Sequence, residues 1–444
     1  MDVIMIANTA EAFAALLKKV AHTPEGARRI RHELTLSQRA FFWGGDNKCV
    51  ITPYPIPTAL LQHNAERCGY GNVVNLSPRE PTVSLSKAVM NDTIVRREVV
   101  AAMKGSSPVR MSPYAFTDDF LWLLRELTRR GVEVDAEGIP KEQSFWTAKH
   151  LDSKLGFRTE MLKLMGTHEF LRIPDGFVAQ NKTEVLDIIE WFYSQNRSAV
   201  VKVNFGESGW GLWIFRVEEY SSSADASDIF RRVLASDPVW KDFPVIVEEF
   251  VEADVAVAGG SPSVELVIQD GPVIIYHCGQ ILNDAGEFFG VEIGKGAVPD
   301  GVKASMERVG KVVGERYHAL GYRGYCDIDF VVSRTGVLYA VETNPRRTGG
   351  THVYDLAKHL YGETWEDQAY LISYDSFRYG DRTIKAKTIL ERTQPLLYPI
   401  AGKRRGIIIT SLNAWEPVMG YVVIAASPKE GRKLQQELLG LFDH

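Results

Sequence analysis

Cysteine is scarce in this sequence, and the few cysteines form no recognisable pattern. The 444 residues contain four of them, and no two are separated by only two residues: Cys49, Cys68, Cys278 and Cys326. Zinc sites and redox centres commonly use closely spaced cysteine pairs, and small secreted domains use dense disulfide frameworks. The cysteine content therefore argues against a zinc site and against a disulfide framework.

Long apolar runs and an excess of charge are also missing. No apolar run approaches the roughly 20 residues that a membrane-spanning helix needs, and the first residues lack the basic start of a signal peptide. The formal net charge is −5 with 24% charged residues, so nothing indicates binding to nucleic acid or to an anionic membrane surface. We expect a cytoplasmic enzyme with neither of these partners.

The length of the chain indicates more than one domain, because a single core rarely organises more than about 300 residues. In the first part of the chain helical and strand-like segments alternate, with predicted buried strands at Arg39–Trp43 and Gly71–Asn75. A helix capped by Thr117 and stopped by Gly131 follows. We expect an N-terminal α/β domain over residues 1–142.

Two further domains are expected after this one. Helical patterns at Ser153–Met165 and Thr183–Gln195 open the second. Near the end of the chain, two short strand-like runs are followed by a helical pattern over Lys429–Phe442. We expect a central domain over residues 143–380 and a small C-terminal domain over residues 381–444.

A predicted hairpin in residues 324–347 places acidic and amide side chains on one face. Two β-rich runs flank Thr335-Gly336, a plausible tight turn. If the turn centres there, Asp329 lies opposite Glu342, and Asp327 lies opposite Asn344. Side chains alternate along a strand, so all four point the same way. The other face then carries apolar residues that suit a core: Ile328, Phe330, Val332, Tyr339 and Val341.

This arrangement predicts a metal site. Like charges that face each other across a strand pair repel unless something neutralises them. A wall of oxygen atoms without thiol or imidazole suits a hard cation such as Mg²⁺. The alternative is a solvated hairpin edge whose acids happen to align, which the apolar residues on both strands disfavour. We expect a metal site that serves a nucleotide.

A lysine and a glycine-rich turn form a second candidate site in residues 200–211. Lys202 lies near the end of a predicted buried strand, and Gly206, Gly209 and Gly211 follow. A point charge and approachable backbone N–H groups are what a polyphosphate needs. The run is not a Walker A loop and opens no helix. A structural lysine beside an ordinary hairpin turn explains these residues equally well.

A third candidate is the strand Val245–Val251, which ends in adjacent acids. Glu248 and Glu249 are followed by the apolar Val251, and Asp254 comes shortly afterwards. Such a strand end can offer backbone groups to the edge of adenine and a carboxylate to ribose hydroxyls. On its own, this pattern is explained better by a strand that runs out into solvent.

The order of these pieces resembles the ATP-grasp superfamily across residues 144–360. The resemblance implies an α+β chain: an ATP-grasp fold preceded by an α/β pre-ATP-grasp domain and followed by a small α+β C-terminal domain. It also implies ATP and Mg²⁺ as cofactors. In that family two lysines hold the phosphates under a glycine loop, an acidic strand end frames adenine and ribose, and Asp with Glu-x-Asn binds the metal. The matching residues are Lys154, Lys202, Gly206, Ser208, Gly209, Glu248, Glu249, Val251, Asp254, Asp329, Glu342 and Asn344.

Two positions leave alternatives open. Lys154 is the weaker lysine match, with Lys149 as its competitor. Several relatives with small amino-acid substrates carry arginine where this chain has Asp327. The positive charge that faces the acyl intermediate must then come from elsewhere, and Arg346 and Arg347 are the candidates for this catalytic role. For one of these two arginines a plain ion pair with neighbouring acids is an acceptable alternative.

A closer resemblance is to the pheganomycin-type peptide ligases. It depends on Phe41-Phe-Trp-Gly-Gly45, on the run Asn344–His352 and on the short C-terminal domain. It implies that an amino acid, often non-proteinogenic, is joined through an acyl phosphate to the N-terminal amine of a peptide in natural-product biosynthesis. The partners implied are a small-molecule amino-acid donor and a peptide acceptor, and a homodimer is left open.

Other functions remain open on the sequence alone. An ATP-grasp ligase could join two small molecules into a dipeptide or amide. A non-catalytic ATP-binding regulatory protein is a second alternative, and a carboxylase or phosphotransferase is a third. The complete Asp, Glu and Asn set argues against the regulatory protein, because a binding module could lose one metal ligand without penalty.

Overall fold

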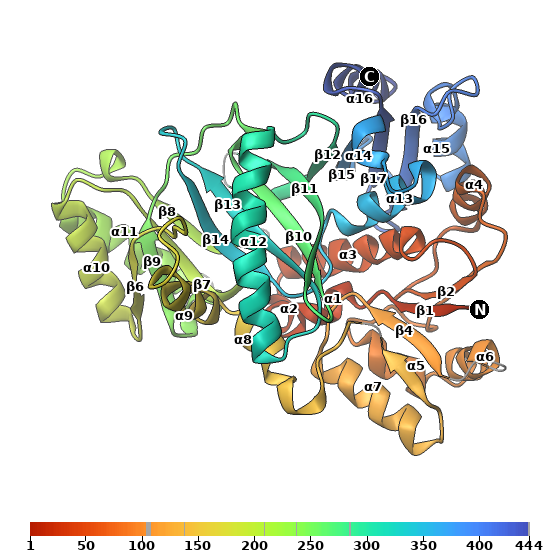
Figure 1. Cartoon of the computed structure of the whole chain (residues 1–444), viewed down its shortest axis with the longest axis horizontal. Helices are drawn as coiled ribbons and strands as arrows, with labels where there is room; N and C mark the ends of the chain where they lie inside the picture. The colour runs from red at the N-terminus through yellow and green to blue at the C-terminus, as the bar shows by residue number, and fades with distance from the viewer. Residues whose placement is uncertain (104–107, 137, 208, 237, 284–285, 443–444) are drawn as a thin grey trace.

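The computed structural model describes residues 1–103, 108–136, 138–207, 209–236, 238–283 and 286–442. Within these residues the strands form a five-stranded, a four-stranded and an eight-stranded sheet. Figure 1 shows the four-stranded sheet in a lobe at one end of the molecule, and the five-stranded sheet with the C-terminal strands at the other end. The described helices include none that combines the length and apolar character needed to cross a bilayer.

The N-terminal sheet is parallel, with the strand order β3-β2-β1-β4-β5. Its strands are apolar on both faces, because Ile4 and Ile6 enter one core and Val3 and Met5 enter another. The strands are β1 (Val3–Ile6), β2 (Lys48–Ile51), β3 (Val73–Leu76), β4 (Val109–Pro113) and β5 (Val134–Ala136). The helices are α1 (Thr9–Ala12), α2 (Ala14–Val20), α3 (Pro24–Leu36), α4 (Thr58–Cys68), α5 (Leu85–Asn91), α6 (Thr93–Met103) and α7 (Asp118–Arg129).

One of the two predicted N-terminal strands is wrong. The run Gly71–Asn75 overlaps β3 as expected, but Arg39–Trp43 lies mostly in the 3-10 helix η1 (Ser37–Phe42). All residues of η1 are buried, since it packs against helix α13 (Thr351–Tyr361) and strand β16 (Gly406–Leu412). A short apolar run buried on every side has no periodicity that separates a strand from a helical turn. The helix cap at Thr117 is confirmed, because its Oγ1 accepts the N–H of Phe120 at 3.0 Å.

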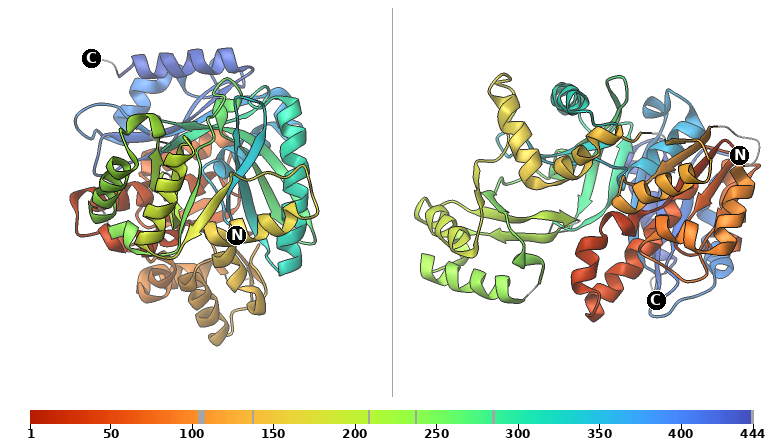
Figure 2. Two further views of the ribbon diagram at one scale, coloured as in Figure 1. Left: turned by 90° about the vertical axis from the view of Figure 1, so that its left-hand side faces the viewer. Right: turned by 90° about the horizontal axis from the view of Figure 1, so that it is seen from below.

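The four-stranded sheet is antiparallel, with the strand order β6-β9-β7-β8. Two helices enclose its core, which forms a separate apolar cluster. The strands are β6 (Gly176–Ala179), β7 (Ala199–Glu207), β8 (Trp210–Phe215) and β9 (Val245–Glu249), and the helices are α10 (Lys182–Ser194), α11 (Ser223–Ser236), η3 (Val217–Glu219) and η4 (Pro238–Lys241). This lobe projects from the rest of the molecule (Figure 2).

The eight-stranded sheet carries the predicted metal hairpin at one edge, in the order β14-β13-β10-β11-β12-β15-β17-β16. Helix α12 lies across β10 and β11 (Figure 1). The strands are β10 (Pro262–Ile268), β11 (Pro272–Leu282), β12 (Phe288–Gly294), β13 (Gly324–Val332), β14 (Leu338–Asn344), β15 (Tyr370–Arg378), β16 (Gly406–Leu412) and β17 (Val418–Ala425). The remaining helices are η2 (Glu142–Ser144), α8 (Trp146–Asp152), α9 (Lys154–Met165), η5 (Ala258–Gly260), α12 (Asp300–Leu320), α13 (Thr351–Tyr361), α14 (Trp365–Gln368), α15 (Ala386–Thr393), η6 (Gln394–Leu396) and α16 (Pro428–Gly440).

The C-terminal strands continue this sheet. Strand β15 pairs with β12 on one side and with β17 on the other, so the expected boundary between residues 380 and 381 divides one continuous sheet. The apolar core beneath the sheet is likewise continuous from Ile328 in the hairpin to Leu438 in α16. The domain boundaries stay a proposal.

Candidate active site

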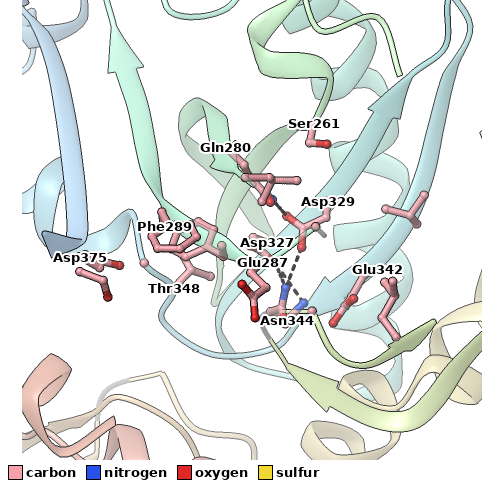
Figure 3. Close-up of a pocket in the computed structure, with 18 of the residues that line it drawn as sticks. Ser261, Gln280, Glu287, Phe289, Asp327, Asp329, Glu342, Asn344, Thr348 and Asp375 are labelled. Atoms are coloured by element: carbon pink, nitrogen blue, oxygen red, sulfur yellow. Dashed lines mark hydrogen bonds between the residues drawn. The ribbon is translucent and has the colours of Figure 1, made fainter. Parts of the chain in front are cut away.

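A cavity of about 620 Å³ is lined by residues of the four-stranded sheet, the eight-stranded sheet and helix α3. The four-stranded sheet contributes Lys202 and the end of β9, and the hairpin contributes Asp329 and Glu342. Helix α3 and strand β15 line the rest, including Glu33 and Asp375. In Figure 3, Glu342 and Asp375 lie at opposite sides of the group of residues drawn. One end of the cavity therefore holds the candidate nucleotide and metal residues, and the other end lies against helix α3.

The hairpin register places the acidic residues as predicted. Asp329 pairs with Glu342 and Asp327 pairs with Asn344. A bulge follows, because Phe330 pairs with Ala340 and Val341 is left over. The expected core role of Tyr339 and Val341 is therefore wrong. Ala340 is buried at 1% exposure, whereas Val341 lines the cavity and both Tyr339 and Val341 are only partly buried.

Hydrogen bonds tie the polar face of the hairpin together (Figure 3). The Asn344 side-chain amide donates to Asp327 Oδ1 at 2.9 Å and to Asp329 Oδ2 at 3.0 Å. The other oxygen of Asp329 accepts from the Gln280 amide on β11. With both amides donating, each carboxylate is oriented before any ligand binds.

The charges on this face are not balanced. Burial, and then the charge of Glu342, raises the pKa of Asp329 to about 7. Burial and the charge of Asp329 raise the pKa of Asp327 well above its usual range. The charge of Arg346 opposes both shifts without cancelling them. A raised pKa means that these carboxylates lack enough positive charge nearby to stay ionised. A hard divalent cation bound between them would supply that charge.

The donors available to such a cation are two carboxylates and one amide: Asp329, Glu342 and Asn344. No cluster of three or more His, Cys, Asp or Glu side chains suited to a metal is found in the part of the chain that the structure describes. This set therefore fits a metal whose remaining ligands come from phosphate oxygens and water, as is usual for Mg²⁺.

Lys154 contacts the hairpin directly. Its Nζ lies 2.8 Å from Glu342 Oε1 and 3.4 Å from the Gly206 carbonyl oxygen. The side chain is fixed at the start of helix α9, where the Ser153 hydroxyl accepts the N–H of Gly156. Lys149, its competitor, is exposed on helix α8. This placement favours Lys154 as the first of the two lysines.

Lys202 and Glu248 form a buried ion pair on neighbouring strands. Both side chains are under 10% exposed, and both residues line the cavity. Arg158, one turn after Lys154 on helix α9, lies 3.6 Å from the second carboxylate oxygen of Glu248. In the sequence, only the spacing of four residues from Lys154, which places both side chains on one face of the helix, could have indicated a role for Arg158.

Of the three candidate residues after Glu248, Glu249 and Val251 line the cavity and Asp254 does not. Glu249 lines the cavity but its carboxylate turns to Arg197. Val251 also lines the cavity, and its backbone N–H makes no hydrogen bond to any residue that the structure describes. Asp254 is not among the lining residues, and its Oδ1 accepts the N–H of Ala256 at 3.1 Å. A purine edge can therefore be met at Val251, while the ribose role of Asp254 has no support from its position.

The glycine-rich turn lies between the four-stranded sheet and the rest of the molecule. A Cβ on Gly206 would lie 2.6 Å from the Trp210 carbonyl oxygen. Gly209 has a φ of +81°, and a Cβ there would lie 3.2 Å from the Gly286 carbonyl oxygen. Trp210 stacks with Arg29 of helix α3, 4.8 Å from ring centroid to guanidinium carbon. Ser208 lies outside the described residues.

Arg346 points toward the acidic face. It lines the cavity, and its backbone N–H donates to the Asn344 carbonyl at 2.8 Å. Its guanidinium carbon lies 5.0 Å from the ring centroid of Phe13 in the N-terminal domain. It is therefore the arginine that a bound substrate can reach.

Arg347 is turned the other way and does not line the cavity. It is 2% exposed, donates to the Ser112 hydroxyl at 2.9 Å and lies 3.6 Å from Asp355. Its guanidinium carbon also lies 3.9 Å from the ring centroid of Tyr325. These contacts connect strand β4 of the N-terminal sheet to the hairpin. The position of Arg347 therefore favours the alternative of a plain ion pair, which the sequence left open for one of the two arginines.

Several residues at the cavity have no sequence signal that identifies them. Gln280 reaches Asp329 only because β11 pairs with β10, which in turn pairs with β13. Glu33 and Asp375 come from elements 342 positions apart in sequence and meet at the far end of the cavity. Only the tertiary fold brings them to the site.

No protein-family model matches the chain. A curated relative, L-propargylglycine–L-glutamate ligase of Streptantibioticus cattleyicolor, is 27% identical over 287 residues, which are 60% of this chain and 53% of the relative. The chain thus spans about half the length of the curated relative that it matches.

Solved structures are similar over nearly the whole chain. N5-carboxyaminoimidazole synthase from Aspergillus clavatus, in complex with ADP and 5-aminoimidazole ribonucleotide, has a TM-score of 0.55 at 14% identity, over 99% of this chain and 98% of that chain. Biotin carboxylase from Campylobacter jejuni has a TM-score of 0.54 at 11% identity, over 100% and 91%. These proteins have the ATP-grasp fold, and this chain has it too.

Proposed function

We propose that this ATP-grasp chain is an ATP-dependent carboxylate–amine ligase, which forms a peptide bond through an acyl phosphate and releases ADP. The observation that carries the proposal is the pairing of Asp329 with Glu342 in one cavity with Lys202 and Arg346. Lys154 lies behind this wall, 2.8 Å from Glu342 Oε1. Acidic metal ligands, a phosphate lysine and a substrate-facing arginine are the parts that phosphoryl transfer to a carboxylate requires.

The nucleotide is proposed to lie between the four-stranded sheet and the hairpin. Lys202 and Glu248 line this end, and the open N–H of Val251 suits an adenine acceptor atom. Lys154 and Lys202 neutralise phosphate charge, while the turn with Gly206 and Gly209 covers it. For Ser208 the family resemblance alone implies the same role. Glu249 offers its backbone to adenine, and Asp254 keeps the ribose role only as the expectation from the family resemblance.

The proposed metal ligands are Asp329, Glu342 and Asn344. Mg²⁺ bound there would screen the phosphate oxygens and orient the terminal phosphoryl group. Gln280 and Asp327 hold these ligands by hydrogen bonds. A divalent cation supplies the positive charge that the buried carboxylates lack.

The chemistry follows from the weak reactivity of a carboxylate. Its oxygen is a poor leaving group, and transfer of the γ-phosphoryl group of ATP converts it into phosphate, which leaves readily. The ammonium loses a proton to solvent, and the neutral amine attacks the acyl carbon to form a tetrahedral oxyanion. The nitrogen then loses a second proton as the oxyanion collapses and phosphate departs. Arg346 is the donor proposed for this oxyanion, because it lines the cavity beside the hairpin. Arg347 supports it by anchoring the segment after β14 to Ser112 and Asp355.

The acceptor is proposed to be the N-terminal amine of a peptide, in the biosynthesis of a peptide natural product. The long cavity, which continues past Arg346 to helix α3 and β15, supports an acceptor larger than ammonia. A second candidate is a ligase that joins two free amino acids. The name of the curated relative, which pairs propargylglycine with glutamate, favours this alternative.

The test is ADP release from Mg-ATP across a panel of amino acids, with hydroxylamine present to trap an acyl phosphate. ADP and hydroxamate that form together with one acid support the proposal and identify the donor. Peptides and single amino acids then replace hydroxylamine to separate the two candidates. Release of AMP, or ATP binding without turnover on any acid, contradicts the acyl-phosphate ligase.

A further inference from the structure

Two buried carboxylates at the far end of the cavity have oxygens that make no hydrogen bond. Glu33 on helix α3 is 2% exposed and Asp375 on strand β15 is 4% exposed, and both line the cavity. Glu33 Oε2 and Asp375 Oδ1 have no hydrogen-bond partner among the described residues. Buried polar atoms in folded proteins nearly always have such a partner. The two oxygens therefore indicate a ligand that donates hydrogen bonds.

The charges around this pair are already partly balanced, which limits what the ligand can be. The second oxygen of Asp375 accepts from Arg39 Nη1 at 2.6 Å. The charges of Arg29, Arg39 and Arg346 act on Glu33, yet burial outweighs them and raises its pKa. The charge of Asp375 adds to this rise. The two open oxygens are hydrogen-bond acceptors, so a ligand group that donates hydrogen bonds and carries a positive charge would be stabilised between them.

The pair also lies in reach of the proposed reaction centre. Arg346 lines the same cavity, and its charge acts on Asp329 at the hairpin and on Glu33 at the far end, so it lies near both. Asp375 and Glu342 flank the drawn residues from opposite sides in Figure 3. A group held by the carboxylate pair would approach the acyl carbon from the side away from the nucleotide.

We propose that Glu33 and Asp375 bind the ammonium group of the amine substrate. An alkylammonium is compact, carries one positive charge and has three donors, which matches two open carboxylate oxygens from facing elements. This inference rests on the proposed ligase function, and it names the part of the cavity that selects the acceptor.

The test is binding of glycinamide to the full chain in the presence of Mg-ADP, measured by isothermal titration calorimetry. N-acetylglycinamide, which lacks the ammonium, is the matched probe. Glycinamide is expected to bind the wild type and its acetylated form is not. Glu33→Gln should weaken glycinamide binding about tenfold or more, since a charge-assisted hydrogen bond is lost. Glu391→Gln is the control, because Glu391 on helix α15 is exposed, lies 3.8 Å from Lys387 and does not line the cavity.

Asp375→Asn gives an independent variant if Glu33→Gln does not fold, and thermal unfolding of each variant reports on its fold. Equal behaviour of the two probes, no detectable glycinamide binding, or unchanged binding in folded Glu33→Gln and Asp375→Asn would each overturn the inference. The binding test needs no turnover. A failed hydroxamate assay with intact glycinamide binding therefore contradicts the ligase proposal alone, and intact hydroxamate formation with no glycinamide binding contradicts this inference alone.

Discussion

Lys154 Nζ lies 2.8 Å from Glu342 Oε1, which joins the start of helix α9 to the edge strand of the central sheet. The lysine side chain is 9% exposed and the glutamate 25%. The ammonium lies beside the positions proposed for the metal and the phosphates, and it neutralises one of the two opposed carboxylates. The site is thus held in shape by a contact between the proposed phosphate lysine and the proposed metal ligand.

We predict that Glu342→Gln lowers ATP-dependent ADP release by about a hundredfold or more, since a neutral amide is a poor ligand for a hard cation. The amide oxygen still accepts from Lys154, so cooperative thermal unfolding should be retained. Steady-state ADP release at saturating Mg-ATP is the measurement. The control is Glu252→Gln, an exposed carboxylate paired with Arg334. Near-normal turnover of a folded Glu342→Gln protein would remove Glu342 from the metal site.

The acidic pairs of this hairpin could be predicted from sequence, although the hairpin departs from the predicted one in its turn and in one strand. These two departures compensate each other. The turn is longer than the predicted two residues, because strand pairing stops at Val332 and Leu338. The bulge at Val341 then adds one residue to the opposite strand and restores the pairing of Asp329 with Glu342. Alternation alone cannot reveal a bulge, because an inserted residue moves every later side chain to the other face. Here the bulge leaves Ala340 buried at 1% exposure.

Motifs that lie on one helix or strand, and their order along the chain, were also predictable. Contacts between elements that are distant in sequence were not. A lysine at a helix start or an acid at a strand end carries a local signal. Gln280, Glu33 and Asp375 carry none, because each enters the cavity through sheet order or domain packing. The same limit explains the wrong strand at Arg39–Trp43, which is buried by elements that lie more than 300 residues away in sequence.

We predict that Mg²⁺ stabilises the protein more at pH 8 than at pH 5.5. Burial and Glu342 raise the pKa of Asp329 to about 7, whereas an unfolded aspartate has a pKa of about 3.9. Between these values the folded state holds a proton that the unfolded state has lost, so stability without metal falls as the pH rises from about 4 to 7. Above pH 7 both states are ionised, the loss ends, and the carboxylate is ready for the cation.

The measurement is the Tm of the protein with a chelator and with Mg²⁺ at each pH. The gain in Tm from Mg²⁺ should grow between pH 5.5 and pH 8. In Asp329→Asn the gain should be small at both values, because the titrating ligand is absent. A gain that is equal at the two pH values in the wild type would contradict the metal assignment of Asp329.

We predict that the neighbouring arginines separate into a catalytic and a structural one. Arg346→Ala should lower amide formation by about a hundredfold, the usual loss of one oxyanion donor, with little change in ATP affinity or Tm. Arg347→Ala should lower the stability by about 3 kcal/mol, because it removes a buried cation from Ser112, Asp355 and Tyr325. Single-turnover ligation, nucleotide titration and denaturant unfolding distinguish the two losses. A loss of ATP affinity in Arg346→Ala would move Arg346 to the phosphates.

We predict that Gly209→Ala uncouples ATP use from ligation. Gly209 has a φ of +81°, which costs an alanine about 1 kcal/mol, and the added Cβ would approach the Gly286 carbonyl oxygen at 3.2 Å. The turn should then cover the phosphates less completely and admit water to the acyl phosphate. The ratio of ADP to amide should rise above the wild-type value.

The control for this change is Gly271→Ala, in the turn between β10 and β11. A Cβ there has no neighbour within 4 Å, and its φ is not in the left-handed region. This variant should keep the wild-type ratio of ADP to amide and should unfold normally. If Gly209→Ala also kept that ratio, the turn would hold the nucleotide without excluding water, and protection of the acyl phosphate would depend on the contact of Trp210 with Arg29 instead. Trp210→Ala, which breaks that contact, would then be the variant in which the ratio rises.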